Sequence, residues 1–256
     1  MNVTFTAHNI RLDDGTFTNP DLPYSIEVHP WLLSAKRILN VVFPGEKSRL
    51  RVVDLGCLEG GYSVEFARMG FHVLGVEVRD SNMAACHYVK ARTNLPNLEF
   101  VQDDVWNVAK YGTFDAAFCC GLLYHLDQPK RFLQLLSSIT KELLIVQTHF
   151  ATEKLESHHS LSPNIVENEG ILGRWYMEFP DDKTFQSRQE YRSASWDNRK
   201  SFWIQREYLL QTIENVGFDT VMEQFDWLGP GMAGALLTGG YRKEARGTFI
   251  GIKSKS

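Results

Sequence analysis

The segment Asp-Leu-Gly-Cys-Leu-Glu-Gly-Gly at residues 54–61 has the composition of a ligand-binding loop. Its glycines carry no Cβ atom, so backbone and ligand can approach closely. The loop follows a predicted strand and opens a predicted helix, and its N–H groups are expected to converge where open α/β sheets bind ligands. Glu77 ends the next predicted strand, where an acidic side chain can accept hydrogen bonds from both hydroxyls of a ribose. The loop and Glu77 together predict a ribose-containing ligand.

Two histidines follow later predicted strands and are candidates for proton transfer. His125 comes after the predicted strand 114–120, and His149 comes after the predicted strand 142–147. Imidazole is suited to act as a general base near neutral pH. Tyr124 is a second catalytic candidate, which can stack on an acceptor or bond to it. Each also has a structural interpretation, because loop histidines often only hold the backbone and Tyr124 is well placed to line a pocket.

With Gln-Asp-Asp-Val at 102–105 and Gly-Leu-Leu-Tyr-His-Leu at 121–126, the sequence resembles the class I S-adenosylmethionine-dependent methyltransferases over roughly residues 50–150. The resemblance implies S-adenosylmethionine as cofactor. It also implies a Rossmann-like α/β fold with a seven-stranded sheet, an antiparallel last edge strand and a lid inserted between strand 5 and the following helix. Within the family, the run 121–126 and the segment 202–218 resemble the wobble-uridine tRNA carboxymethyltransferases and related small-molecule methyltransferases.

The resemblance implies a role for each residue of the cofactor site. The glycines and Asp54 would line the methionine part of the cofactor, Glu77 would hold the ribose, and Asp104 would face the adenine amino group. The implied cofactor-binding residues are Asp54, Gly56, Cys57, Glu59, Gly60, Glu77, Asp104, Val105 and Gly121. Leu58 stands where many members have a second glycine, which leaves the backbone path and the role of Glu59 open.

The sequence favours a small-molecule acceptor. The net charge is −4, and segment 174–206 has seven basic residues against five acidic ones, a slight excess where a tRNA-binding surface needs a basic patch. A sulfonium methyl group is already activated, so the protein has to align and desolvate the reactants, and a hydroxyl acceptor also benefits from a base. We therefore expect SN2 methyl transfer to a hydroxyl of a sugar or secondary metabolite. The predicted acceptor contacts are His149, Trp175 and Trp196.

Three other functions are weighed against this one. A tRNA-modifying methyl- or carboxymethyltransferase would have the same fold, and a non-catalytic module that binds the cofactor or a partner would keep the sheet without turnover. A dinucleotide dehydrogenase is disfavoured because the loop lacks the G-x-G-x-x-G spacing. No metal site is expected, since the four cysteines form no CxxC pair and have no ligand spacing to histidine.

The composition, 43% hydrophobic and 23% charged over 256 residues, is typical of a soluble globular protein. No apolar run approaches the length of a membrane span, and the N-terminal residues lack a secretory pattern. The expectation is a reduced, cytoplasmic protein.

Alternating strands and helices must position these residues, and such alternation predicts a parallel sheet covered on both faces. We expect strands at 51–55, 72–77, 98–102, 114–120, 142–147, 218–227 and 248–253, and helices at 30–42, 62–69, 129–139, 202–216 and from a cap at Ser81 to about 93. A glycine-rich loop is expected at 229–240. The whole is predicted to be a single domain, with an N-terminal helical cover (1–48), a cofactor core (49–149), a lid (150–201) and a C-terminal helix and antiparallel strand pair (202–256).

Overall fold

The structure is a computed structural model that describes residues 3–153, 159–180, 183–188, 191, 194–243 and 245–254. It divides into two compact units, Met1–Phe118 and Cys119–Ser256. The predicted single domain and its internal boundaries remain a prediction. No helix in the described ranges combines the length and the apolar character that crossing a membrane requires.

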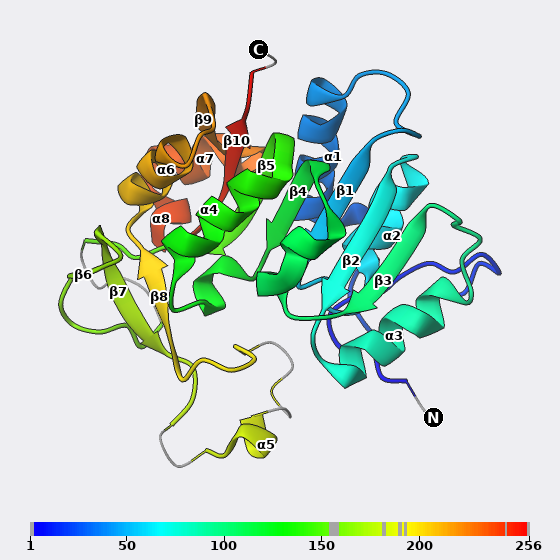
Figure 1. The fold of residues 1–256 in the computed structure, drawn as a ribbon, viewed down its shortest axis with the longest axis horizontal. Helices are drawn as coiled ribbons and strands as arrows, with labels where there is room; N and C mark the ends of the chain where they lie inside the picture. Colours follow the sequence, from blue (N-terminus) through cyan, green and yellow to red (C-terminus); the bar gives the residue numbers. More distant parts are fainter. Residues whose placement is uncertain are drawn as a thin grey trace. The chain divides into compact units, whose positions relative to one another are not determined.

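The first unit alternates parallel strands with helices (Figure 1). Its elements are η1 (Ile26–Val28), α1 (Pro30–Val42), β1 (Arg51–Leu55), α2 (Gly61–Arg68), β2 (His72–Glu77), α3 (Asp80–Lys90), β3 (Leu98–Gln102), η2 (Val105–Tyr111) and β4 (Phe114–Cys120). The last two residues of β4, Cys119 and Cys120, belong to the second unit. Strand β2 pairs in parallel with β1 and with β3. The carboxyl ends of these strands therefore meet at one edge of the sheet, which is where open α/β sheets bind ligands.

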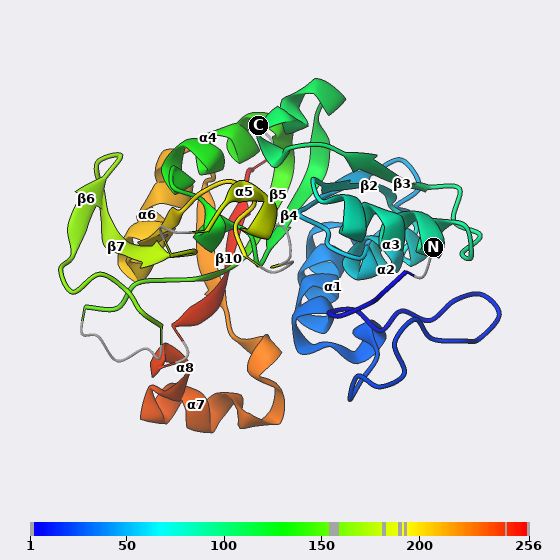
Figure 2. The ribbon, with the colours of Figure 1, turned by 90° about the horizontal axis from the view of Figure 1, so that it is seen from below.

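The second unit contains the remaining elements. They are η3 (Leu123–His125), α4 (Pro129–Ile139), β5 (Thr140–His149), β6 (Val166–Asn168), β7 (Ile171–Met177), α5 (Phe185–Arg188), β8 (Lys200–Ile204), α6 (Arg206–Asn215), β9 (Thr220–Gln224), η4 (Asp226–Gly231), α7 (Met232–Thr238), α8 (Gly240–Lys243) and β10 (Arg246–Ile252). Strand β10 runs antiparallel to both β5 and β9. Figure 2 shows α7 and α8 side by side, in orange and red, and α8 packs against β10.

The described strands form two sheets. The larger has seven strands in the order β3-β2-β1-β4-β5-β10-β9, and the smaller has three antiparallel strands in the order β6-β7-β8. The larger sheet confirms the predicted Rossmann-like α/β fold with an antiparallel pair closing one side. The last strand in sequence, β10, lies one position inside the edge, and β9 forms the edge itself.

The predicted helix 202–216 is wrong over its first residues. Phe202, Trp203 and Ile204 belong to β8, and the helix α6 begins only at Arg206. Aromatic and β-branched side chains fit a pleated surface better than a helix, and all three of these are buried. The lid segment thus contains a small sheet where no regular structure could be assigned from sequence.

The predicted glycine-rich loop at 229–240 is also wrong in part, because it contains α7. Gly229 and Gly239 have positive φ values of 60° and 65°, and they bound a run of Met, Ala and Leu that favours a helix. Helix α3 begins at Asp80 and its N-cap is Arg79, two residues before the predicted cap at Ser81. The predicted strand 218–227 shortens to Thr220–Gln224.

Two glycines of the second unit predict opposite responses to the same substitution. A Cβ at Gly173 in β7 would lie 2.2 Å from the carbonyl oxygen of Trp203, whereas a Cβ at Gly234 in α7 would meet nothing within 4 Å. We expect Gly173→Ala to destabilise the protein by at least ~1–3 kcal/mol, because backbone must move. Gly234→Ala is the matched control and should be neutral or stabilising by ~0.4–1 kcal/mol. Thermal unfolding measures both, and equal midpoints would contradict the packing described here.

Candidate functional site

The glycine loop is fastened to the end of β2 by its own backbone. The N–H groups of Gly56 and Cys57 both donate to the carbonyl oxygen of Val76, at 2.9 and 3.1 Å. The N–H of Leu58 donates to Oε2 of Glu77 at 3.0 Å. Strand β2 therefore determines the path of the loop, and the loop and Glu77 lie together as the sequence predicts.

Leu58, the departure from the family pattern, adopts a conformation that glycine would tolerate more easily. Its φ is +50°, in the left-handed region, which costs an L residue roughly 1–2 kcal/mol. Two hydrogen bonds hold it there, since its N–H donates to Glu77 and its carbonyl accepts from Sγ of Cys86 at 3.1 Å. Leu58 thus occupies a left-handed position that two hydrogen bonds stabilise.

Asp54 and Glu77 place two buried carboxyl groups beside this loop. Asp54 is 2% exposed and accepts a 2.6 Å hydrogen bond from Oγ of Ser63, while Glu77 also accepts from the N–H groups of Val78 and Arg79. Burial raises the pKa of Asp54 to about 7 and also raises the pKa of Glu77. A cationic ligand would favour the ionised forms of both, so this donor set fits a sulfonium cofactor.

Asp103 and Asp104 follow β3 and make different contacts. Asp103 accepts from the N–H of Asp104, from Nδ2 of Asn107 and from the hydroxyl of Tyr111, and it pairs with Lys110. These contacts make Asp103 the residue that closes the turn. Asp104 caps η2 by accepting from the N–H of Trp106 at 2.9 Å, and the neighbouring Val105 is buried.

Glu59, expected beside the cofactor, instead holds the N-terminal segment of the chain. Its side chain is 1% exposed, and its two oxygens accept hydrogen bonds from the N–H groups of Thr6, Ala7 and His8 and from the hydroxyl of Thr6, at 2.6 to 3.1 Å. All four donors lie more than fifty residues upstream. No local pattern predicts this contact, because it joins segments that are distant in the sequence.

His8 completes the attachment of the N-terminal segment to the loop. Its Nδ1 accepts the N–H of Gly61, the first residue of α2, at 3.1 Å, and its ring packs edge-on against Tyr62. Because Nδ1 accepts, the folded state favours the neutral imidazole. Burial lowers the pKa of His8 to about 4, with Glu59 opposing the shift and His29 adding to it.

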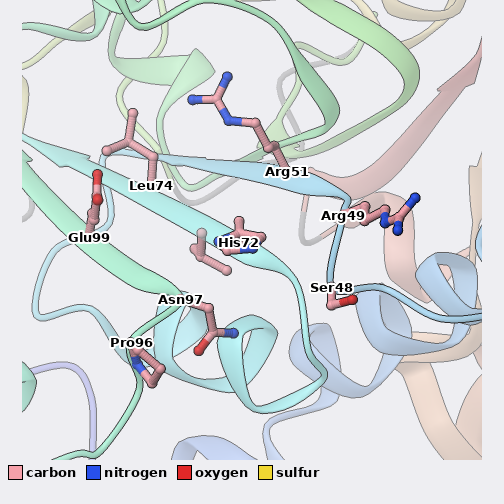
Figure 3. A pocket seen from close by; sticks show the side chains of 9 residues that line it. Ser48, Arg49, Arg51, His72, Leu74, Pro96, Asn97 and Glu99 are labelled. Carbon is pink, nitrogen blue, oxygen red and sulfur yellow. The ribbon is translucent and has the colours of Figure 1, made fainter.

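A hollow of about 370 Å³ opens elsewhere in the first unit (Figure 3). Residues at or near the starts of β1, β2 and β3 line it, among them Arg51, His72 and Asn97. The glycine loop and Glu77 follow the opposite, carboxyl ends of β1 and β2. The hollow therefore does not contain the predicted cofactor residues.

In the second unit, the indole of Trp203 is the centre of an aromatic and histidine cluster. It stacks on His149, with centroids 4.7 Å apart and planes 12° apart, and on Tyr176 at 5.2 Å. Its Nε1 donates to the carbonyl of Tyr124 at 3.0 Å, and the Tyr124 and His149 rings lie 4.7 Å apart. The structure thus brings the predicted residues Tyr124 and His149 together around Trp203.

His149 is held neutral. Its Nδ1 lies 3.1 Å from the carbonyl oxygen of Ala245, which can only accept, so the proton is on Nδ1 and Nε2 carries the lone pair. Burial, assisted by the positive charge of Arg246 and by His159, lowers the pKa of His149 to about 3. His149 can accept a hydrogen bond but is a weak base.

His125 has a different partner, which the sequence did not reveal. Its Nδ1 lies 2.8 Å from Oε1 of Glu178, whose side chain is 2% exposed. Glu178 also accepts from Oγ of Ser201 at 2.7 Å and from the N–H of Ser195 at 3.2 Å. Asn198 fixes the backbone of His125 through a 2.9 Å bond from Nδ2 to its carbonyl.

The two tryptophans predicted to contact an acceptor lie away from this cluster. Trp175 pairs in register with Phe202 and packs against its ring at 5.1 Å, on the face of β7 and β8 opposite to Trp203. Trp196 packs against Phe185. Gly121 follows β4 with a φ of 73° and donates to the carbonyl of Gln147. Among the described residues, no group of three His, Cys, Asp or Glu side chains could bind a metal ion. His158 lies outside the described residues.

Comparisons with known proteins agree with this geometry. Residues 52–142 match a family model described as a methyltransferase domain. The N-terminal domain of EvdMO1, crystallised in the presence of SAH and D-fucose, superposes with a TM-score of 0.67 at 21% identity, over 96% of this chain and 90% of that one. The fold is that of a class I methyltransferase.

Two curated relatives share part of this methyltransferase fold. A Geobacillus protein (strain WCH70) named as a methyltransferase is 33% identical over 86 residues, which are 33% of this chain and 34% of that protein. A ubiquinone biosynthesis O-methyltransferase of Acinetobacter baumannii (strain AYE) is 26% identical over 93 residues, which are 36% of this chain and 39% of the relative. The chain thus spans little more than a third of these relatives.

The attachment of the N-terminal segment to Glu59 can be broken selectively. In Glu59→Gln, the side-chain amide group replaces one acceptor oxygen and faces N–H donors. We therefore expect faster hydrogen exchange at the amides of Thr6, Ala7 and His8 and a decrease of ~1–3 kcal/mol in the free energy of unfolding. Glu65→Gln is the control, because Glu65 is equally buried but pairs with Lys36 and Arg68. Mass spectrometry of exchange distinguishes the two, and equal exchange at residues 6–8 in both variants would refute the contact.

His8 makes the stability of the protein depend on pH. Between about pH 4 and its ordinary value of 6.5, the unfolded chain binds a proton at His8 that the folded chain does not. Stability is therefore lost as pH falls through this window, with a slope from this group of up to ~1.4 kcal/mol per pH unit. The raised pKa of Asp54 has the opposite effect on stability, but Asp54 is present both in the parent and in a His8→Gln variant, so its effect cancels when the two are compared. Denaturant unfolding should show a shallower loss in His8→Gln than in the parent, and parallel curves would argue against a neutral His8.

Proposed function

We propose that the protein is an S-adenosylmethionine-dependent methyltransferase that methylates a hydroxyl group of a small molecule, such as a sugar. The observation that carries the proposal is the glycine loop fastened to Glu77 at the ends of β1 and β2, within the matched residues 52–142. In this proposal the cofactor supplies an activated methyl group, and the chain binds it, orients the acceptor and accepts a proton.

The first unit provides the proposed cofactor contacts. Glu77 would hold the ribose, at the point where its carboxylate also accepts the N–H groups of Leu58, Val78 and Arg79. Gly56 and Gly60 would lie against the methionine part, with Asp54 and Cys57 beneath the loop. Asp104 and Val105 would face the adenine. Glu59 contributes by holding the N-terminal segment against the loop.

The second unit provides the proposed acceptor contacts. His125 would act as the general base, and Tyr124 and His149 would orient the acceptor, with His149 accepting a hydrogen bond through Nε2. Tyr176 is half-buried, and its ring suits contact with a sugar ring or an aromatic ring. Two comparisons support a hydroxyl, because EvdMO1 was crystallised with D-fucose and a curated relative is an O-methyltransferase.

A tRNA acceptor has less support. Of the seven basic residues in segment 174–206, Arg174 is 4% exposed and donates to four backbone carbonyls, while Arg206 pairs with Glu223. Buried and paired guanidinium groups add little to a surface that must neutralise phosphates.

Cofactor binding tests the first half of the proposal. Isothermal titration with S-adenosylhomocysteine should show binding, and Glu77→Gln should weaken it by ~10-fold or more, because a buried hydroxyl contact and a loop bond are both altered. Glu99→Gln is the matched control, an exposed carboxylate two strands from β1 in the same sheet, and it should bind as the parent does.

Product analysis tests the second half. With S-adenosylmethionine, the protein should convert one or more of a panel of 6-deoxyhexoses and phenols into methyl ethers, which NMR detects. No binding of S-adenosylhomocysteine at millimolar concentration would overturn the cofactor assignment. Cofactor binding without turnover on hydroxyl, amine and tRNA acceptors would instead favour the non-catalytic module.

A further inference from the structure

We propose that Glu178 is the positioning residue for the base His125, holding its imidazole with the proton on Nδ1 and the lone pair on Nε2. The inference rests on the proposed function for its chemical consequence, but its structural part concerns only residues of the second unit. No residue pattern in the sequence pointed to Glu178, which follows β7, 53 positions after His125.

The donors around Glu178 determine the tautomer of His125. Oε1 accepts from the Ser201 hydroxyl and Oε2 from the Ser195 N–H, so both oxygens act as acceptors. An ionised carboxylate has no hydrogen to donate. The short contact from His125 to Oε1 must therefore use a proton on Nδ1, and this leaves Nε2 as the basic atom.

The same donors keep Glu178 ionised although it is withdrawn from water. Burial by itself raises the pKa of a carboxyl group, but the bonds from His125, Ser201 and Ser195 outweigh this effect and the pKa of Glu178 is lowered. The two side chains also differ in access, since 14% of the His125 side chain is exposed against 2% for Glu178. The imidazole thus keeps some exposed surface, whereas the carboxylate is almost fully withdrawn from solvent.

The neighbouring His149 shows what a carboxylate partner adds. Both imidazoles donate from Nδ1, but His149 donates to the neutral carbonyl of Ala245 and has Arg246 and His159 beside it. A neutral partner and a nearby cation disfavour an imidazolium, whereas an ionised carboxylate stabilises one. Of the two histidines, the geometry selects His125 to accept a proton.

In the reaction, Nε2 of His125 takes the hydroxyl proton of the acceptor while the oxygen forms its new bond to the methyl carbon. The methyl–sulfur bond breaks and the sulfur keeps its electron pair, which gives a methyl ether and a neutral thioether. The positive charge of the sulfonium is thus replaced by that of the imidazolium, which Glu178 stabilises. The imidazolium later returns its proton to water.

The test reads the tautomer directly. In the parent with ¹⁵N-labelled histidine, NMR near pH 8 should show His125 with Nδ1 protonated and Nε2 bare. In Glu178→Ala this single tautomer should be lost, whereas in Glu178→Gln the amide oxygen can still accept from Nδ1 and only the negative charge is removed. Glu169→Gln is the matched control, because Glu169 is another carboxylate of the second unit that accepts the N–H groups of Lys130 and Arg131, and its loss should leave the His125 signals unchanged.

Turnover provides the second readout. For a hydroxyl acceptor found in the panel, Glu178→Gln should lower kcat by ~10²-fold or more, with the Kd for S-adenosylhomocysteine unchanged. His125→Ala should lower kcat similarly, and the double variant should be no worse than either alone. A tautomer that persists in Glu178→Ala overturns this proposal. The NMR measurement needs neither cofactor nor acceptor, so a parent that binds no S-adenosylhomocysteine overturns the proposed function separately.

Discussion

A carboxylate that is withdrawn from water must find hydrogen-bond donors, and three buried glutamates organise this chain through that requirement. Glu77 takes the N–H group of Leu58 in the glycine loop and those of Val78 and Arg79 after β2, which joins the loop to β2. Glu59 takes three N–H groups of the N-terminal segment, and Glu178 takes the imidazole proton of His125. Hydrogen bonds to buried carboxylates therefore hold the residues of the candidate site, whereas burial of apolar side chains stabilises the strands and helices that carry them.

The helices and strands were largely predictable from the sequence, but the hydrogen-bond partners of the buried glutamates were not. Buried parallel strands appear as short apolar runs, and positive-φ glycines such as Gly56 mark turns, so β1 to β5 and the loop could be located from local patterns. Glu59 and Glu178 look like ordinary surface glutamates in the sequence. The donors to Glu59, and His125 as the partner of Glu178, lie about fifty residues away, and no periodicity connects them. The roles of Asp54 and Glu77 toward a cofactor stay predictions, and the contacts of Glu59 with the N-terminal segment could not be derived from local patterns.

Alternation along β8 decides which aromatic residues can share a surface. Successive side chains of a strand point to opposite faces, so Trp203 joins His149 and Tyr176, whereas Phe202 joins Trp175 on the other face. A helix over residues 202–204, as the sequence pattern predicts, would not define which face of a strand each side chain occupies. In the structure Trp175 lies on the face opposite to Trp203, and Trp203 carries the stacking contacts of the cluster.

The distance along the chain between Thr6–His8 and Glu59 also has a kinetic meaning. During synthesis, these first residues leave the ribosome long before their carboxylate partner exists, and closing a loop of about fifty residues carries an entropic cost that nearby contacts avoid. Docking of the N-terminal residues is thus expected to come after β1, the glycine loop and α2 have formed. A newly made chain would pass through a stage with an assembled sheet and an uncovered loop, and the same stage would be the first step of unfolding.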